Sequence, residues 1–303
     1  MGDSGVVDAA LTVAKAQGTE VYQDAIKPWL KPLGHVAGVL VRAVVVALHS
    51  LEGWVADKEA ARDRMLSAVA WKVEGIPPDD LVLPRPAVAQ PAIEGMAQNL
   101  GESESELFDQ FANLLANSMS RRHADRVHPG FAATLKQMTS SEAELARWFF
   151  LNSQQSGDRR TPCIRLQAAH VENETLFEHV LSYYLGEGPY EIFNRDGSII
   201  AASLNNFERL GLFCAPIFPA DKPRGGYLLL ESGHLAKDAA KFHALREEKT
   251  IQDLSNKVER DTFLRNAEIR EGYAILSDFG ILFLQACLIP PSTPAEQHIQ
   301  APS

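Results

Sequence analysis

Residues 106–131 read ELFDQFANLLANSMSRRHADRVHPGF, an amphipathic stretch followed by a basic turn that closes on His-Pro-Gly. A helix that packs one face into a core shows apolar residues three and four positions apart. That spacing is met at Leu107, Phe111, Leu114, Leu115 and Met119. The pattern predicts a core helix, and it leaves open whether the turn is a functional site or a helix end held in place.

The basic turn carries Arg121, Arg122 and Arg126, with His128 just beyond them. The C-terminus of a helix has a partial negative charge that cations stabilise, so the simplest role for the three arginines is to cap the preceding helix. His128 is then expected to hydrogen-bond into the following turn. Binding of phosphate or another anion by the same side chains is the alternative, and these four residues are the candidate binding site.

A metal site in the turn would use His123, Asp125 and His128, since imidazole and carboxylate suit zinc, manganese or iron. Positions five apart on a helix are rotated by about 140° from one another, away from the four-residue offset that aims two ligands at one ion. Pro129 also ends any helix nearby. We therefore expect no metal ligands, no cofactor and no catalytic residues.

The chain divides by composition into five segments. We expect an N-terminal helical region (1–75), a proline-rich strap (76–93), a central helical segment (94–136), a winged-helix-like domain (137–290) and a disordered tail (291–303). The strap has five prolines between residues 76 and 91, which favours extended chain over helix. The fold class is mostly α with a small β component.

The winged-helix expectation rests on the order of elements after residue 137. A helix with Ser140 or Ser141 as its N-cap comes first, and Glu144 is placed to form a capping box with Ser141. The second helix is expected within Ser198–Phe213. A strand near Tyr273 and a final helix opened by Ser277 or Asp278 follow, after a charged helical insertion over 234–268. The second helix carries no net charge, which is poor for reading DNA and favours an interaction module.

Bulk properties narrow the functional classes. The chain has 303 residues and a formal net charge of −10, which works against non-specific attraction to nucleic acid. Its three cysteines form no CxxC pair and no secretory signal is visible, so a cytoplasmic location is expected. Sequences of the types GxSxG, GxGxxG and GxxxxGK[ST] are missing, and no enzyme is indicated.

One apolar run, Val36 to Leu48, is interrupted only by Arg42. Its length of about 13 residues falls short of the roughly 20 that span a bilayer as a helix. A buried helix is the simplest interpretation, and contact with the surface of the inner membrane is the alternative.

Three stretches together resemble the bacterial abortive-infection alpha family. They are GIPPDDLVLPRPAVAQPAIEGM with ELFDQFANLLANSM, the His128-Pro129-Phe131 step before LKQMTSSEAELARW, and LNNFERLGLF with YAILSDFGILFLQACL. The resemblance runs from about Lys72 to Ile289 and implies a role in phage resistance, with no established active site. The family-like positions are mostly structural, and His128 is the polar one among them: Pro84, Pro86, Pro91, Phe111, Ala112, Leu114, His128, Pro129 and Phe131.

The resulting hypothesis is an anti-phage defence protein that acts by binding, as a sensor or an effector, with a phage or host protein as its partner. A membrane surface is a further partner to consider, and nucleic acid is disfavoured. Two alternatives stay open: a winged-helix DNA-binding regulator, and an antitoxin or immunity-type protein that binds a basic toxin.

Overall fold

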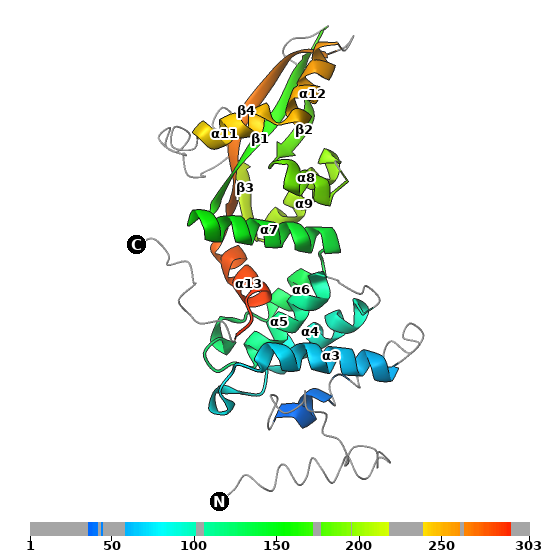
Figure 1. Cartoon of the computed structure of the whole chain (residues 1–303), viewed down its shortest axis with the longest axis vertical. Coiled ribbons are helices and arrows are strands. Elements are labelled where there is room, and N and C mark those ends of the chain that lie inside the picture. Colours follow the sequence, from blue (N-terminus) through cyan, green and yellow to red (C-terminus); the bar gives the residue numbers. More distant parts are fainter. Residues whose placement is uncertain are drawn as a thin grey trace, which may run out of the picture. The chain divides into compact units, whose positions relative to one another are not determined.

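The structure is a computed structural model that describes residues 36–41, 44, 58–100, 106–171, 177–194, 196–217, 239–260 and 264–291 (Figure 1). Contacts divide the chain into two compact units, residues 1–143 with 282–300 and residues 144–281 with 301–303. The division falls inside two helices, α7 (Ser140–Ser156) and α13 (Asp278–Leu288). The segments expected from composition were drawn on a different basis, and their boundaries stay a prediction. The predicted class, mostly helical with a small sheet, is confirmed.

The first unit is built from α3 (Lys58–Val73), α4 (Pro86–Gln98), α5 (Glu106–Ser118) and α6 (Gly130–Leu135), with two short 3-10 helices at Pro78–Asp80 and Ala124–Arg126. Helix α5 lies against α3, α4 and α6. All five apolar positions predicted for its buried face are buried. Gly95 of α4 allows the close approach of α5, because a Cβ there would lie 2.3 Å from the Phe111 ring.

The strap prediction was wrong for its second half, where residues 86–93 belong to α4. Pro86 is the first residue of the helix, a position whose N–H has no partner within the helix in any case, so proline is tolerated there. Pro91 lies inside the helix and removes one hydrogen bond, but Val88, Ala92 and Ile93 are buried. Packing of that apolar face outweighs the missing bond.

A buried lysine joins α3 to α5. Lys72 is 3% exposed, and its ammonium lies 2.7 Å from a carboxylate oxygen of Asp109. Lys72 is thus one of the few charged residues among the buried ones that the structure describes. Because Asp109 is half exposed, the pair keeps contact with water and the desolvation of the lysine is only partly compensated inside the protein.

The second unit is organised around a four-stranded antiparallel sheet in the order β2-β1-β4-β3. The strands are β1 (Arg160–His170), β2 (Phe177–Tyr184), β3 (Phe213–Ile217) and β4 (Leu264–Leu276). The central pair β1–β4 runs from Arg160 opposite Ile275 to His170 opposite Leu264. The sheet thus pairs segments that lie about a hundred residues apart in the chain.

Helices cover both faces of this sheet. Phe213 of β3 contacts Phe149 of α7 and Phe207 of α9 (Gly197–Arg209), with ring centroids 4.6 and 5.5 Å apart. Tyr273 of β4 contacts Phe242 of α11 (Ala239–Glu247) on the opposite face. Alternate residues of a strand point to opposite faces, and Phe213 pairs with Leu276, three positions from Tyr273. Eight of eleven residues of β1 are accordingly buried.

The winged-helix arrangement is not confirmed. The second predicted helix exists as α9, and Gly211 ends it with a φ of +75°. Residues 239–259 of the expected insertion form α11 and α12 (Lys249–Glu259), but residues 264–268 lie in β4 and were wrongly predicted to be helical. The run has two charged residues, Arg265 and Glu268, and their three-residue spacing suits a helix, so the sequence pattern does not reveal the strand.

The predicted starts of two helices have different outcomes. Ser277 opens α13 as predicted, since its hydroxyl accepts a hydrogen bond from the Gly280 N–H at 2.8 Å. The capping box of α7 lies two residues earlier than predicted. Thr139 accepts from the Glu142 N–H at 3.2 Å, and Glu142 accepts from the Thr139 N–H at 2.8 Å.

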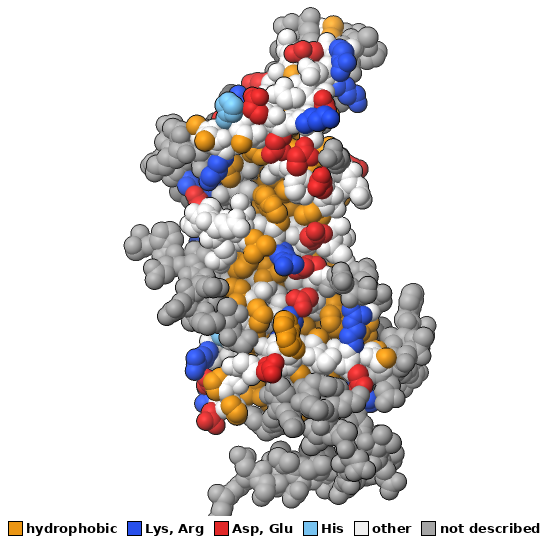
Figure 2. All heavy atoms as spheres, in the orientation of Figure 1, with side chains coloured by type: hydrophobic (Ala, Val, Ile, Leu, Met, Phe, Trp, Pro, Cys, Tyr) orange, Lys and Arg blue, Asp and Glu red, His pale blue; other side chains and the backbone are white. Residues whose placement is uncertain are grey.

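The apolar run at 36–48 is described only at residues 36–41 and 44. Val36, Leu40 and Val44 share one helical face and are buried, whereas Val39 is 53% exposed. The rest of the run lies outside the described residues. Among the described helices, none combines the length and apolarity needed to cross a membrane. On the face shown in Figure 2, acidic and basic side chains are interspersed with hydrophobic ones.

Candidate functional site

The basic turn after α5 is held by the strap. The Leu81 and Ser120 backbones form an antiparallel bridge. The Val82 N–H donates to the Met119 carbonyl at 2.8 Å, and the Arg121 N–H donates to the Asp80 carbonyl at 2.8 Å. These backbone bonds place the turn at the end of α5 without using any of the arginine side chains.

One arginine of the strap caps the turn. A guanidinium nitrogen of Arg85 donates to the carbonyls of Ala124 and Val127, at 2.8 and 2.6 Å. Arg85 directly precedes α4, and Pro84 and Pro86 on either side restrict its backbone. Sequence reasoning missed this residue because its partners lie about forty positions further along the chain.

The three arginines named from the sequence behave differently from one another. Arg122 pairs with Asp80, with 2.8 Å between Nε and the carboxylate oxygen, and remains 71% exposed. Arg121 and Arg126 are exposed, and their guanidinium groups make no hydrogen bond or ion pair with any residue that the structure describes. Arg85 therefore caps the carbonyls of the turn. Arg121 and Arg126 place their positive charges on the exposed surface.

His128 hydrogen-bonds into the following turn, as predicted. Its Nδ1 accepts from the Gly130 N–H at 3.0 Å, at the start of α6. Its ring lies 5.9 Å from that of buried Phe131, which in turn meets Phe283 edge-on at 5.6 Å. This geometry explains His-Pro-Gly-Phe as the start of a helix anchored in the core, and a binding role for His128 stays a prediction.

The histidines of the turn have separate partners. Nδ1 of His123 lies 3.0 Å from the Ser120 hydroxyl, whereas Nδ1 of His128 is engaged by Gly130. Over the described ranges, no group of three or more His, Cys, Asp or Glu side chains is arranged to hold a metal ion. His123, Asp125 and His128 form no such group.

Two buried asparagines of α5 satisfy the end of α13. The amide of Asn113 donates to the Cys287 carbonyl at 2.9 Å. The amide of Asn117, one turn later, donates to the carbonyls of Ala286 and Ile289 at 2.9 and 2.7 Å. The last carbonyls of a helix have no partner within it, so these side chains replace water there. The motif FANLLAN contains both residues, but the sequence alone did not reveal their partners.

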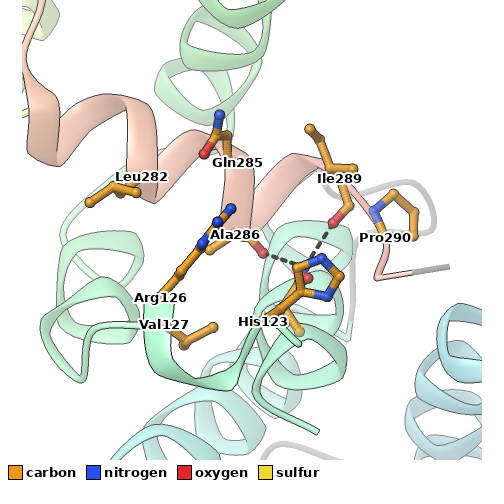
Figure 3. Close-up of a pocket in the computed structure, with 9 residues that line it drawn as sticks. His123, Arg126, Val127, Leu282, Gln285, Ala286, Ile289 and Pro290 are labelled. Atoms are coloured by element: carbon orange, nitrogen blue, oxygen red, sulfur yellow. Dashed lines mark hydrogen bonds between the residues drawn. The ribbon is translucent and has the colours of Figure 1, made fainter. Parts of the chain in front are cut away.

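A small hollow lies beside this helix end (Figure 3). Its volume is about 30 Å³, room for a side-chain tip and far below the roughly 300–1,000 Å³ of a typical small-molecule site. In Figure 3 the Arg126 side chain points from the turn toward α13. The lining combines a mainly apolar surface with four polar side chains: Asn117, His123, Arg126, Val127, Leu282, Gln285, Ala286, Ile289 and Pro290.

Comparison with known proteins supplies the family. The model of the family described as abortive infection alpha matches residues 57–287, about three quarters of the chain. No curated protein and no solved structure matches the chain. The match includes α3 to α12 and most of α13, and hence the basic turn, the two asparagines and most of the lining of the hollow.

Proposed function

The chain belongs to the abortive infection alpha family, and from that membership we propose that it acts in abortive-infection defence by binding another protein, without catalysing a reaction. The observation that carries the proposal is the family match over residues 57–287. The partner in this proposal is a phage component or a host component that changes during infection. The chain then serves as the sensor or the effector of the response.

The basic turn supports binding as the mode of action. Arg121 and Arg126 are exposed and have no side-chain partner in the part of the chain that the structure describes. Exposed arginines are enriched at the centres of protein interfaces, because the guanidinium combines a large contact surface with several hydrogen-bond donors. We place the binding surface at Arg121, Arg122, Arg126 and His128, with the adjoining hollow.

The proposal assigns the protein to the cytoplasm. All three cysteines are free thiols, which suits a reducing compartment. It gives no membrane role to the apolar run at 36–48, because Val36, Leu40 and Val44 already face the interior. Exposing them would remove core contacts of the first unit.

A phage-plating assay tests the proposal. Bacteria that express the full chain should plate a panel of phages less efficiently than bacteria with an empty vector, and infected cells should die without releasing a normal burst. Equal plating on both hosts for every phage would overturn the defence role. Survival of infected cells with no phage release would overturn the abortive mechanism.

The same assay separates the binding surface from the rest of the chain. Arg126→Glu should abolish protection, because it reverses the charge at the proposed contact. Lys257→Glu is the matched control: Lys257 is exposed on α12, and its side chain has no partner among the described residues. Full protection by the Arg126 variant, or equal loss in both variants, would argue against this surface.

A further inference from the structure

Four polar side chains line the hollow beside the end of α13, and they differ in whether they already have a hydrogen-bond partner. The amide of Asn117 is already engaged with the carbonyls of Ala286 and Ile289, and Nδ1 of His123 with Ser120. The side chains of Arg126 and Gln285 have no hydrogen-bond partner within the described residues. Of the groups left to meet an occupant, Arg126 is a cation, and the Gln285 amide offers both an N–H donor and a carbonyl acceptor.

The remaining lining is apolar. Val127 is 1% exposed and Leu282 is 42% exposed, and Ala286, Ile289 and Pro290 complete the apolar part of the lining. An occupant must therefore present an anionic group next to an apolar one. A nucleic acid backbone meets the first requirement and fails the second.

The size of the hollow decides what kind of molecule carries these groups. About 30 Å³ accepts the tip of one side chain, so an isolated metabolite would leave most of its surface in water. A side chain of a larger partner has no such difficulty, because contacts around the rim add to the affinity. Arginine and a carboxylate can form two parallel hydrogen bonds, which favours Asp or Glu as the anion.

We propose that this hollow receives an acidic peptide segment of a partner protein, with an Asp or Glu carboxylate on Arg126 and a neighbouring aliphatic side chain against Val127 and Leu282. This rests on the proposed function in one respect, that the protein acts by binding. It names the chemistry of the partner and the residues that recognise it, and it extends the surface to α13.

Selection from a random dodecapeptide library on the purified full-length chain tests the proposal. Enriched peptides should contain Asp or Glu beside Leu, Ile or Val. Synthetic copies should bind Arg126→Glu on the order of ten- to a hundred-fold more weakly than the wild type, the value of a hydrogen-bonded charge pair. Leu282→Asp should weaken them too, and Lys257→Glu should leave the affinity unchanged.

The results that would overturn the proposal are equally definite. They are failure to enrich any peptide, enrichment of basic or neutral peptides, or equal binding to the wild type and the Arg126 variant. Arg126 is exposed, and thermal unfolding of each variant checks that its fold is intact. Phage restriction without acidic-peptide binding would remove this inference and keep the defence role, whereas peptide binding without restriction would do the reverse.

Discussion

Asn117 joins two helices that lie far apart in sequence. Its amide donates to two carbonyls at the end of α13, and its side chain is 4% exposed. Replacing it with alanine leaves those carbonyls without a donor. We expect Asn117→Ala to lower the free energy of unfolding by about 2–3 kcal/mol, as measured by urea denaturation.

Gln137→Ala is the control for that substitution. The Gln137 amide donates to the Ala133 carbonyl at 3.0 Å on the exposed surface of the first unit. Its loss should change the free energy of unfolding by less than about 0.5 kcal/mol, because water replaces the bond. If both variants unfold at the same urea concentration, the hydrogen bonds of Asn117 do not stabilise the end of α13.

The three thiols should differ in reactivity. Cys163 and Cys287 are buried, and burial raises both thiol pKa values, that of Cys163 to about 12. Cys214 is half-buried. Because the thiolate is the reactive form, a thiol reagent at pH 8 should label one cysteine of the native chain and three in guanidinium. Cys214→Ser should abolish native labelling; labelling that persists would mean that Cys163 or Cys287 becomes accessible.

At the scale of single residues, local roles were predictable and distant ones were not. The hydrogen bond of His128 into the next turn spans two positions, so the sequence His-Pro-Gly contains its whole cause. Arg85 and Asn117 act on carbonyls about forty and 170 positions away. Nothing in the sequence near a capping side chain indicates a partner that only the fold brings close.

At the scale of elements, Gly280 shows how tightly α13 meets the loop before β3. A Cβ at this position would lie 2.1 Å from the Leu212 carbonyl oxygen, a backbone atom that cannot rotate away. We expect Gly280→Ala to destabilise the chain by at least about 2 kcal/mol, measured by thermal or urea unfolding. The small gain in helix propensity, about 1 kcal/mol, does not offset that clash.

Gly188→Ala provides the comparison in the same unit. Gly188 lies in the short helix α8 (Glu187–Ile192), where a Cβ would lie 3.7 Å from Trp148, an ordinary contact distance. This variant should be as stable as the wild type or slightly more stable. Equal destabilisation of the two variants would show that steric contact at Leu212 is not the cause.

An ion pair between α4 and α6 should respond to acid. The hydrogen bond from Lys136 holds the pKa of Glu94 below its ordinary value of 4.5, which outweighs the effect of partial burial. A lowered pKa in the folded state stabilises the protein above pH 4.5, and this contribution is lost as the pH falls through the folded value. Both side chains are partly exposed, so the effect at neutral pH should stay below about 1 kcal/mol.

Urea unfolding of the wild type and Glu94→Gln from pH 7 to pH 3 measures that dependence. The stability difference should be present at pH 7 and should shrink as the pH falls through the lowered pKa of Glu94. Glu74→Gln is the control, since Glu74 is exposed and its side chain has no partner among the described residues. A difference that is constant across this range would contradict the ion pair as its source.

Element boundaries show which sequence signals are ambiguous. The segment TSSE offers three hydroxyl residues before one acid, and the structure uses Thr139 with Glu142 where Ser141 with Glu144 was predicted. The prolines of the strap favour extended chain over helix, yet Pro86 begins α4. In both cases several local patterns were acceptable, and burial of neighbouring apolar side chains decided between them.

At the scale of the whole molecule, the class of the fold was predictable and the topology was not. Apolar spacing identified α5, α9 and α13 because each helix carries its own pattern. The pairing of β1 with β4 joins Arg160 to Ile275, and no local pattern specifies such a register. The coverage of both sheet faces likewise depends on α7, α9 and α11 together, and the order of elements along the chain does not specify that arrangement.

The net charge of −10 leads to a prediction about nucleic acid. A protein that neutralises several phosphates binds DNA with an affinity that falls steeply as salt rises, whereas an anionic chain is repelled at long range. We expect no binding of a 30-base-pair duplex at 150 mM salt in fluorescence anisotropy, and at most weak binding at 50 mM. The opposite result would be micromolar binding at 150 mM salt that becomes weaker in the variants Arg121→Gln, Arg122→Gln and Arg126→Gln. The basic turn would then be a phosphate-binding surface. That result would contradict both the acidic-peptide partner and the choice of a protein over DNA, since the same guanidinium groups would then have a nucleic acid ligand.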